Sequence, residues 1–392
     1  MYNFYIRNFE KYKFDNKSYG LKLICIVFVL LIIIKSKLTP LTYDEAYTYL
    51  NYVITKDYFN IGLANNHLLN TLLIGVTSSF NNSELLLRAP SVAFGIIYVF
   101  VAFKFSEKYN YNYLVLFIFL FNPLIMDFFS LARGYSISAS LNLGAIYLYL
   151  YSNYKYKYPL IIFLLWLSSL AIFINLITLF LIIFLNYFFQ KKATKNIHTN
   201  ITNVVFLILS WPIVNWVFEI TKKNKPLYGN EVEILLYERV VTVFGFVSTY
   251  FVSSILLCIV FVFITLVFYF KFYSVSKIKT FSSVLFFSTL LCLIIIPMIF
   301  GRPFPVNRVL IPFIPIFQLL LVSIFGEIDN HISKNIIIFL LLFNFIFSYN
   351  LEESLVWGKT IDINKQGDLS YCESLEVSRP EIQYYLKFKE FC

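Results

Sequence analysis

Two adjacent carboxylates follow the first long apolar run of the chain. Asp44 and Glu45 stand in the stretch 41–49, among several tyrosines. Charged residues make up only 14% of the 392 residues. Acidic side chains next to a membrane span are rare and usually functional. A carboxylate can take the proton of a hydroxyl group as that group attacks a substrate. The pair therefore predicts an acid–base site in the loop after the first span.

One histidine and three arginines supply complementary chemistry. They are His67, Arg88, Arg133 and Arg308, and Tyr135 follows Arg133 by two residues. Arginine binds phosphate through a two-pronged fork and keeps its charge at every physiological pH. Positive charge also stabilises the negative charge that develops on a departing phosphate. The set favours transfer of a group from a phosphate-bearing donor, with tyrosine rings lining a sugar site.

Each of these residues also has a structural interpretation, which the sequence leaves open. Asp44 is a good N-cap residue for a helix, and Glu45 would complement the positive start of that helix. Arg88 would anchor a helix turn. Arg133 would pair with Asp127 instead of a substrate.

A divalent metal ion is a further alternative for the acidic pair. The candidate ligands are Asp44, Glu45 and His67. One histidine with two acids is not a strong ligand signature. The sequence therefore leaves a metal cofactor possible but not indicated.

The composition predicts an all-α, polytopic integral membrane protein. Hydrophobic residues make up 59% of the chain, and its charged fraction lies far below the roughly 25% of soluble domains. A spanning helix needs about 20 mostly apolar residues. About eleven segments qualify by that rule; within 158–190 only Asn175 interrupts the apolar run. They are residues 21–38, 88–106, 112–127, 136–152, 158–173, 175–190, 202–219, 251–271, 281–300, 308–326 and 334–350.

The distribution of lysines predicts the orientation. With the N-terminus in the cytoplasm, the loops on that side are rich in lysine. The net charge of +10 is then explained by these loops and not by nucleic-acid binding. The acidic pair, His67 and the arginine motifs would all fall on the outer face of the membrane. The C-terminus would lie on that face too.

The domain organisation follows from these spans. We expect one transmembrane domain over 1–350, whose first outer loop, 39–87, carries the acidic motif. Helices lying in the membrane interface are expected over 44–55 and after 231–239. A short polar tail, 351–392, would follow on the outer face. Two of the five cysteines, Cys372 and Cys392, lie in that tail and could pair there.

The order of the motifs resembles the GT-C superfamily of glycosyltransferases that use polyprenyl-phosphate sugars. The branch that it resembles contains the protein mannosyltransferases and the lipid A aminoarabinose transferases. The matching elements are Tyr43-Asp44-Glu45-Ala46-Tyr47, Ala64-Asn65-Asn66-His67-Leu68-Leu69-Asn70-Thr71-Leu72, Leu87-Arg88-Ala89-Pro90-Ser91, Ser130-Leu131-Ala132-Arg133-Gly134-Tyr135 and Asn307-Arg308-Val309-Leu310-Ile311-Pro312. The chain departs from the family pattern after His67, where two leucines replace the usual prolines.

The resemblance implies a specific reaction. A sugar would pass from a polyprenyl-phosphate donor to a hydroxyl of a glycan, lipid or protein acceptor on the outer face of the cytoplasmic membrane. Asp44 would act as base or orient the acceptor, with Glu45 beside it, and the anomeric centre would invert. His67, Arg88, Arg133, Tyr135 and Arg308 would bind the substrates.

Two other classes of membrane protein fit part of the pattern. A transporter or flippase of lipid-linked sugars would also carry outer arginines, but it would need polar groups near mid-membrane and paired helix breaks. An O-antigen polymerase or ligase would use a large loop late in the chain. Here the acids lie in the first loop, which favours the transferase.

Overall fold

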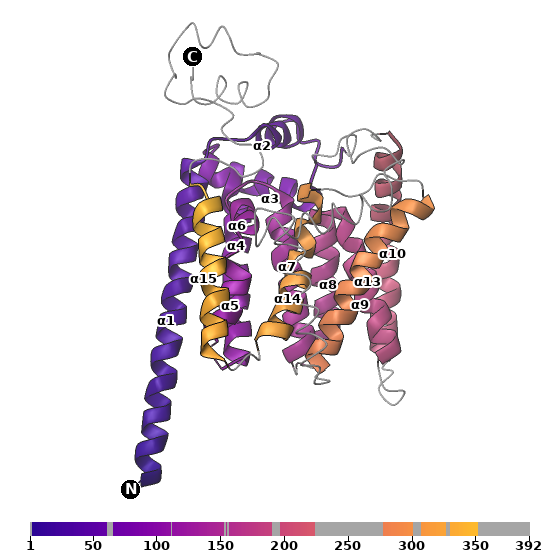
Figure 1. Ribbon diagram of the computed structural model, residues 1–392. Coiled ribbons are helices and arrows are strands. Elements are labelled where there is room, and N and C mark those ends of the chain that lie inside the picture. Colours follow the sequence, from indigo (N-terminus) through magenta and orange to yellow (C-terminus); the bar gives the residue numbers. More distant parts are fainter. Residues whose placement is uncertain are drawn as a thin grey trace, which may run out of the picture.

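The protein is a bundle of helices with one short helical segment lying across its end (Figure 1). The computed structural model describes residues 2–60, 66–110, 112–152, 154, 157–189, 197–223, 277–300, 307–326 and 330–351. Across these residues the chain forms helices and no strand, which confirms the predicted all-α class for this part of the sequence. The predicted span 251–271, the outer helix after 231–239 and both tail cysteines lie outside the described residues.

The first half of the chain supplies most of the bundle. Its helices are α1 (Tyr2–Leu38), α2 (Tyr43–Thr48), the π-helix η1 (Tyr49–Val53), α3 (Leu68–Ser78), α4 (Glu84–Lys108), α5 (Tyr113–Leu120), α6 (Pro123–Phe129), α7 (Gly134–Tyr151), α8 (Lys157–Ala171), the 3₁₀ turn η2 (Phe173–Asn175) and α9 (Leu176–Phe189). The later helices are α10 (Ile197–Lys223), α13 (Lys277–Phe300), the 3₁₀ segment η5 (Asn307–Phe313), α14 (Ile314–Phe325) and α15 (His331–Ser348).

Among the described helices, α4 and α15 are long and apolar enough to cross a membrane. Several other predicted spans are interrupted. The segment 112–127 divides into α5 and α6, because the Asn122 side chain caps the Ile125 N–H at 3.0 Å and Pro123 starts a new helix. The structure therefore supports membrane association, while the count of eleven spans stays a prediction.

At Asn175, where the sequence predicts an interruption, a network of hydrogen bonds links neighbouring helices. The Asn175 amide donates to the Ser168 hydroxyl at 2.7 Å and accepts from the Asn142 amide at 2.9 Å. Asn142 also donates to the Pro312 carbonyl at 2.9 Å. These bonds join α7, α8 and η5 where η2 breaks the helical run. Breaks of this kind are tolerated in an apolar bundle only when neighbours satisfy the freed polar groups.

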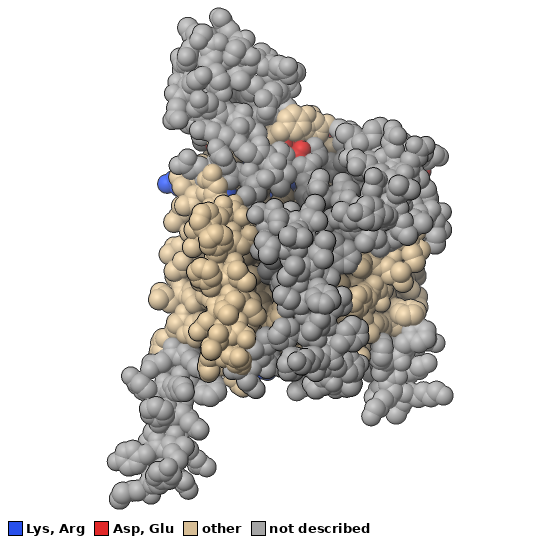
Figure 2. Space-filling view, viewed as in Figure 1, with Lys and Arg blue, Asp and Glu red and all other residues tan. Residues whose placement is uncertain are grey.

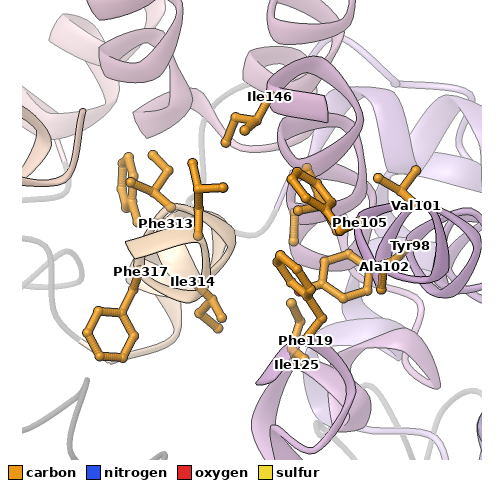
Figure 3. Packing of buried hydrophobic residues seen from close by; sticks show 14 of the residues in the cluster. Tyr98, Val101, Ala102, Phe105, Phe119, Ile125, Ile146, Phe313, Ile314 and Phe317 are labelled. Carbon is orange, nitrogen blue, oxygen red and sulfur yellow. The ribbon is translucent and has the colours of Figure 1, made fainter. Parts of the chain in front are cut away.

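The core is built mainly from aromatic and branched side chains. Tyr98 and Phe105 of α4 and Phe119 of α5 lie together on one side of the core, across from Ile314 of α14 (Figure 3). All of these side chains are buried. Phe317 of α14 packs against Phe286 of α13.

The polar side chain of Gln318 on α14 lies in this core and bonds groups of α4 and α5. Gln318 bonds the Tyr98 hydroxyl and donates to the carbonyls of Ile118 and Phe119 at 3.0 and 3.1 Å. Those carbonyls belong to the last turn of α5, where a helix lacks its own donors. Gln318 therefore ties α14 to the point at which α5 ends.

Lys35 belongs to the interior of the bundle. Its ammonium lies 2.8 Å from Oδ1 of Asp127, and both side chains are fully buried. It also stands over the ring of Tyr349, 4.5 Å from the centroid, and bonds the Asn350 carbonyl. The pair joins α1, α6 and the end of α15, and it gives Asp127 a partner other than Arg133. α1 and α15 accordingly lie side by side in Figure 1.

The outer surface of the bundle is apolar. On the face shown in Figure 2, charged side chains of the described residues are few and lie towards the two ends. On α15, Phe339, Phe343 and Phe347 are exposed by 63%, 52% and 75%. A contiguous apolar surface of this kind suits hydrocarbon better than water.

Candidate functional site

The acidic pair lies in the first turn of α2, above one end of the bundle (Figure 1). The Glu45 N–H donates to the Thr42 hydroxyl at 3.4 Å, and the Thr42 N–H donates to Oε2 of Glu45 at 2.8 Å. This reciprocal arrangement is a capping box. Neighbouring residues of a helix point in different directions. Asp44 and Glu45 therefore meet different partners, despite being adjacent in sequence.

Glu45 is engaged in a buried two-pronged ion pair with Arg88. Oε1 accepts from Nε of Arg88 and Oε2 accepts from Nη2, each at 2.8 Å. Oε1 also accepts the Ala132 N–H at 2.6 Å. Burial alone would raise the pKa of Glu45, but the Arg88 charge and these hydrogen bonds hold that pKa below its usual value. Glu45 is ionised and fully bonded.

Arg88 closes the end of α1. Its Nη1 donates to the carbonyls of Ser36 and Thr39 at 2.9 and 2.6 Å, and Nη2 donates to the Pro40 carbonyl at 2.9 Å. Together with the two bonds to Glu45, these contacts engage all five N–H donors of the guanidinium. The structure thus favours the anchoring alternative for Arg88 over phosphate binding.

Asp44 faces a different arginine. Its Oδ2 lies 3.4 Å from Nη2 of Arg133, and its carbonyl accepts from Nη1 of Arg133 at 3.3 Å. Thr48, one turn further along, accepts from the same Nη1 at 3.4 Å. These contacts are longer than those of the Glu45–Arg88 pair. Asp44 and Arg133 are therefore adjacent and buried.

Arg133 is held by its backbone. In the connection between α6 and α7, the Ala132 N–H is bound by Glu45 and the Ala132 carbonyl accepts from the Asn70 amide at 3.0 Å. The Arg133 carbonyl accepts from the Ser91 hydroxyl at 3.2 Å. Hydrogen bonds from side chains of α2, α3 and α4 thus hold the backbone at Arg133 in place. The guanidinium of Arg133 points towards Asp44.

His67 and Tyr135 complete this cluster. The two rings meet edge to face, with centroids 4.9 Å apart. The guanidinium carbon of Arg133 lies 5.9 Å from the centroid of Tyr135. Gly134 permits the approach, because a Cβ at that position would stand 2.9 Å from Cβ of His67. The structure therefore brings together Asp44, His67, Arg133 and Tyr135 from three separate segments.

No metal site is formed by the three candidate ligands. Within the described part of the chain, no group of three or more His, Cys, Asp or Glu side chains is placed to hold a metal ion. Glu45 is committed to Arg88 and to two backbone N–H groups. The alternative of a metal bound by Asp44, Glu45 and His67 is not supported by this geometry.

Arg308 lies at the start of η5, and its side chain is outside the described residues. Asn65 and residues 301–306 lie outside them too. The expected meeting of Arg308 with Arg133 thus stays a prediction.

The sequence reasoning did not single out Tyr52, and it included Asn70 in the 64–72 element without giving it a role. Tyr52 is 3% exposed and Asn70 is fully buried. Burial raises the pKa of Tyr52, and the nearby charge of Arg133 partly opposes that increase. One available signal was the fourfold spacing of Asp44, Thr48 and Tyr52, which places all three towards Arg133.

The chain was compared with models of protein families, with curated proteins and with solved structures, and none of these comparisons found a match.

Proposed function

We propose that the protein is a polytopic membrane glycosyltransferase, which moves a sugar from a polyprenyl-phosphate donor to an acceptor hydroxyl on the outer face of the cytoplasmic membrane. The apolar outer surface of the bundle supports the membrane setting. The lipid tail of the donor would lie between helices. Its phosphate and sugar would then reach the end of the bundle that carries α2.

The placement of Asp44 beside Arg133 carries the proposal. The buried carboxylate of Asp44 lies 3.4 Å from the buried guanidinium of Arg133, which also donates to the Asp44 carbonyl at 3.3 Å, next to the Tyr135 and His67 rings. The neighbouring pair, Glu45 and Arg88, has its bonding capacity filled. The chemistry is therefore assigned to Asp44 and Arg133.

The reaction uses these two groups in one displacement. The acceptor oxygen attacks the anomeric carbon while its proton passes to the carboxylate of Asp44. The bond from the anomeric carbon to the phosphate oxygen breaks, and the electron pair leaves with the phosphate. Arg133 stabilises that charge. In-line attack inverts the anomeric centre. The leaving group is already an anion, so the step needs no strong general acid.

The function is tested by sugar transfer. Purified protein in lipid is given a panel of radiolabelled polyprenyl-phosphate sugars together with membrane extract as a source of acceptors. Label should move from the donor to an acceptor with at least one sugar. Movement of the intact donor across the bilayer without transfer would instead identify a flippase. No transfer with any sugar of the panel would refute the proposal.

The orientation is tested separately with two single cysteines. Lys56 and Lys108 are both exposed. Lys56 follows η1, whereas Lys108 ends α4, whose first turns carry Arg88 beside α2. A membrane-impermeant maleimide should label Lys56→Cys in intact cells and Lys108→Cys only after permeabilisation. The reverse pattern would place Asp44 on the cytoplasmic side and would contradict an outer-face reaction.

A further inference from the structure

The π-helix η1 holds a buried tyrosine hydroxyl close enough to Arg133 to be influenced by its charge. The Tyr52 side chain is 3% exposed, and its hydroxyl has no hydrogen-bond partner among the described residues. A buried polar group that lacks a partner costs free energy, so such groups are few in native proteins. Tyr52 therefore needs an explanation outside the stability of the protein alone.

The helix geometry directs Tyr52 towards the reacting groups. Asp44, Thr48 and Tyr52 follow one another at intervals of four residues, and the first two contact Arg133 directly. The helix widens at this point into η1, where the Ile54 N–H donates to the Tyr49 carbonyl at 3.0 Å. Such π-turns occur frequently at functional sites.

The side chain of Asn70 contains a second buried polar atom that makes no hydrogen bond among the described residues. α3 packs against η1, and Asn70 of α3 uses its amide N–H to bind the Ala132 carbonyl. Its Oδ1 is buried and has no hydrogen-bond partner within the described ranges. Asn70 thus lies next to the peptide that carries Arg133, and η1, against which α3 packs, holds the buried hydroxyl of Tyr52. A sugar phosphate offers groups that match both.

Tyr49 provides an internal comparison. It is 3% exposed like Tyr52 and belongs to the same π-helix. Its hydroxyl donates to Oδ1 of Asn82 at 2.6 Å. The hydroxyl of Tyr49 therefore has a partner within the fold, whereas the hydroxyl of Tyr52 has none among the described residues.

We propose that Tyr52 is a donor-binding residue whose hydroxyl donates a hydrogen bond to the phosphate of the polyprenyl-phosphate sugar held by Arg133. Asn70 Oδ1 accepts from a hydroxyl of the same donor sugar. This inference rests on the proposed function and extends it, because it names the residues that bind the donor in addition to arginine. Tyr52 binds and does not itself transfer a proton.

The test compares Tyr52→Phe with Tyr49→Phe in the full-length protein. Undecaprenyl phosphate serves as the probe, and its effect on the Tm of purified protein reports binding without any need for transfer. Wild type and Tyr49→Phe should show the same stabilisation. Tyr52→Phe should bind about 10- to 100-fold more weakly, the range for a lost hydrogen bond to a charged group. Undecaprenol, which lacks the phosphate, should give no stabilisation.

The Tm without ligand separates binding from folding. Tyr52→Phe removes an unsatisfied hydroxyl and should unfold at or above the wild-type Tm, whereas Tyr49→Phe should unfold below it. Equal binding of the probe by Tyr52→Phe and wild type, or no binding by wild type, would overturn the inference. If the probe binds in a Tyr52-dependent way but no sugar of the panel is transferred, the glycosyltransferase assignment fails while the phosphate site stands.

Discussion

Replacing Glu45 with glutamine keeps the shape of the side chain and removes its charge. Each carboxylate oxygen now accepts two hydrogen bonds, one from Arg88 and one from a backbone N–H. The glutamine NH₂ group would face two donors where one of those oxygens stood. Arg88 would also stay buried without its counter-charge. Breaking a buried pair in this way costs about 3–5 kcal/mol.

The double variant Glu45→Met with Arg88→Met distinguishes this network from an ordinary buried ion pair. Apolar replacement of both partners is often neutral, because no charge is left buried. Here five backbone groups would lose a partner as well, at about 1–3 kcal/mol for each group that stays buried. They are the carbonyls of Ser36, Thr39 and Pro40 and the N–H groups of Thr42 and Ala132. We therefore expect the double variant to be no more stable than Glu45→Gln.

The assay is thermal unfolding of purified protein in one detergent. A cost of this size should lower Tm by about 5–10 °C in Glu45→Gln. The double variant should show a decrease at least as large. Recovery of the wild-type Tm by the double variant would refute the reasoning, because the backbone bonds would then contribute little.

The same side chain predicts a dependence on acid. The folded pKa of Glu45 is depressed below its unfolded value, so the folded state binds this proton less readily than the unfolded state. Its contribution to stability is present above the unfolded pKa and is lost as the pH falls towards the folded one. Wild type should lose stability below a pH of about 4.5. Glu45→Gln should lose less over the same interval, and equal losses would contradict the pairing.

Two further substitutions test other parts of the bundle. Lys35→Met should destabilise the protein by about 3–5 kcal/mol, because Asp127 would stay buried without its counter-charge. Lys35→Met with Asp127→Leu should recover most of the lost Tm, because no charge is then left buried. A double variant as unstable as the single one would contradict this. Gly134→Ala should destabilise the protein by about 1–3 kcal/mol, because the added Cβ would stand 2.5 Å from the Ala171 carbonyl oxygen. Gly144→Ala is the matched control, because its Cβ would meet no atom within 4 Å. It should be neutral or stabilising in the same unfolding assay. Equal effects at the two glycines would show that α7 and α8 do not pack as closely as described.

Much of the bundle could be predicted from periodicity and composition, because apolar runs mark helices directly. Helix breaks were harder to predict. The division of 112–127 depends on one capping side chain, Asn122, inside an otherwise apolar run. The π-helix depends on packing against α3 and leaves no mark in a short sequence pattern. Local sequence therefore located the helices better than it located their interruptions.

The candidate site shows the same limit. The sequence predicted that Asp44 and Arg133 carry polar chemistry, and the structure brings them together. The sequence could not predict which acidic side chain pairs with which arginine, because the pairing depends on the directions in which the side chains leave α2. Arg88 pairs with Glu45, and Asp127 pairs with Lys35. These pairings join residues far apart in the chain, so only the folded arrangement reveals them.

The division of roles between the two acids is tested most directly by the rate of sugar transfer per folded molecule. Asp44→Asn and wild type are purified, their folded fractions are measured by thermal unfolding, and kcat is determined with the donor that wild type uses. Asp44→Asn should lower Tm, because buried Arg133 loses its counter-charge, and per folded molecule it should lose at least about 100-fold in kcat, the scale of general-base catalysis. A kcat within a few-fold of wild type would contradict the assignment of Asp44 as the base.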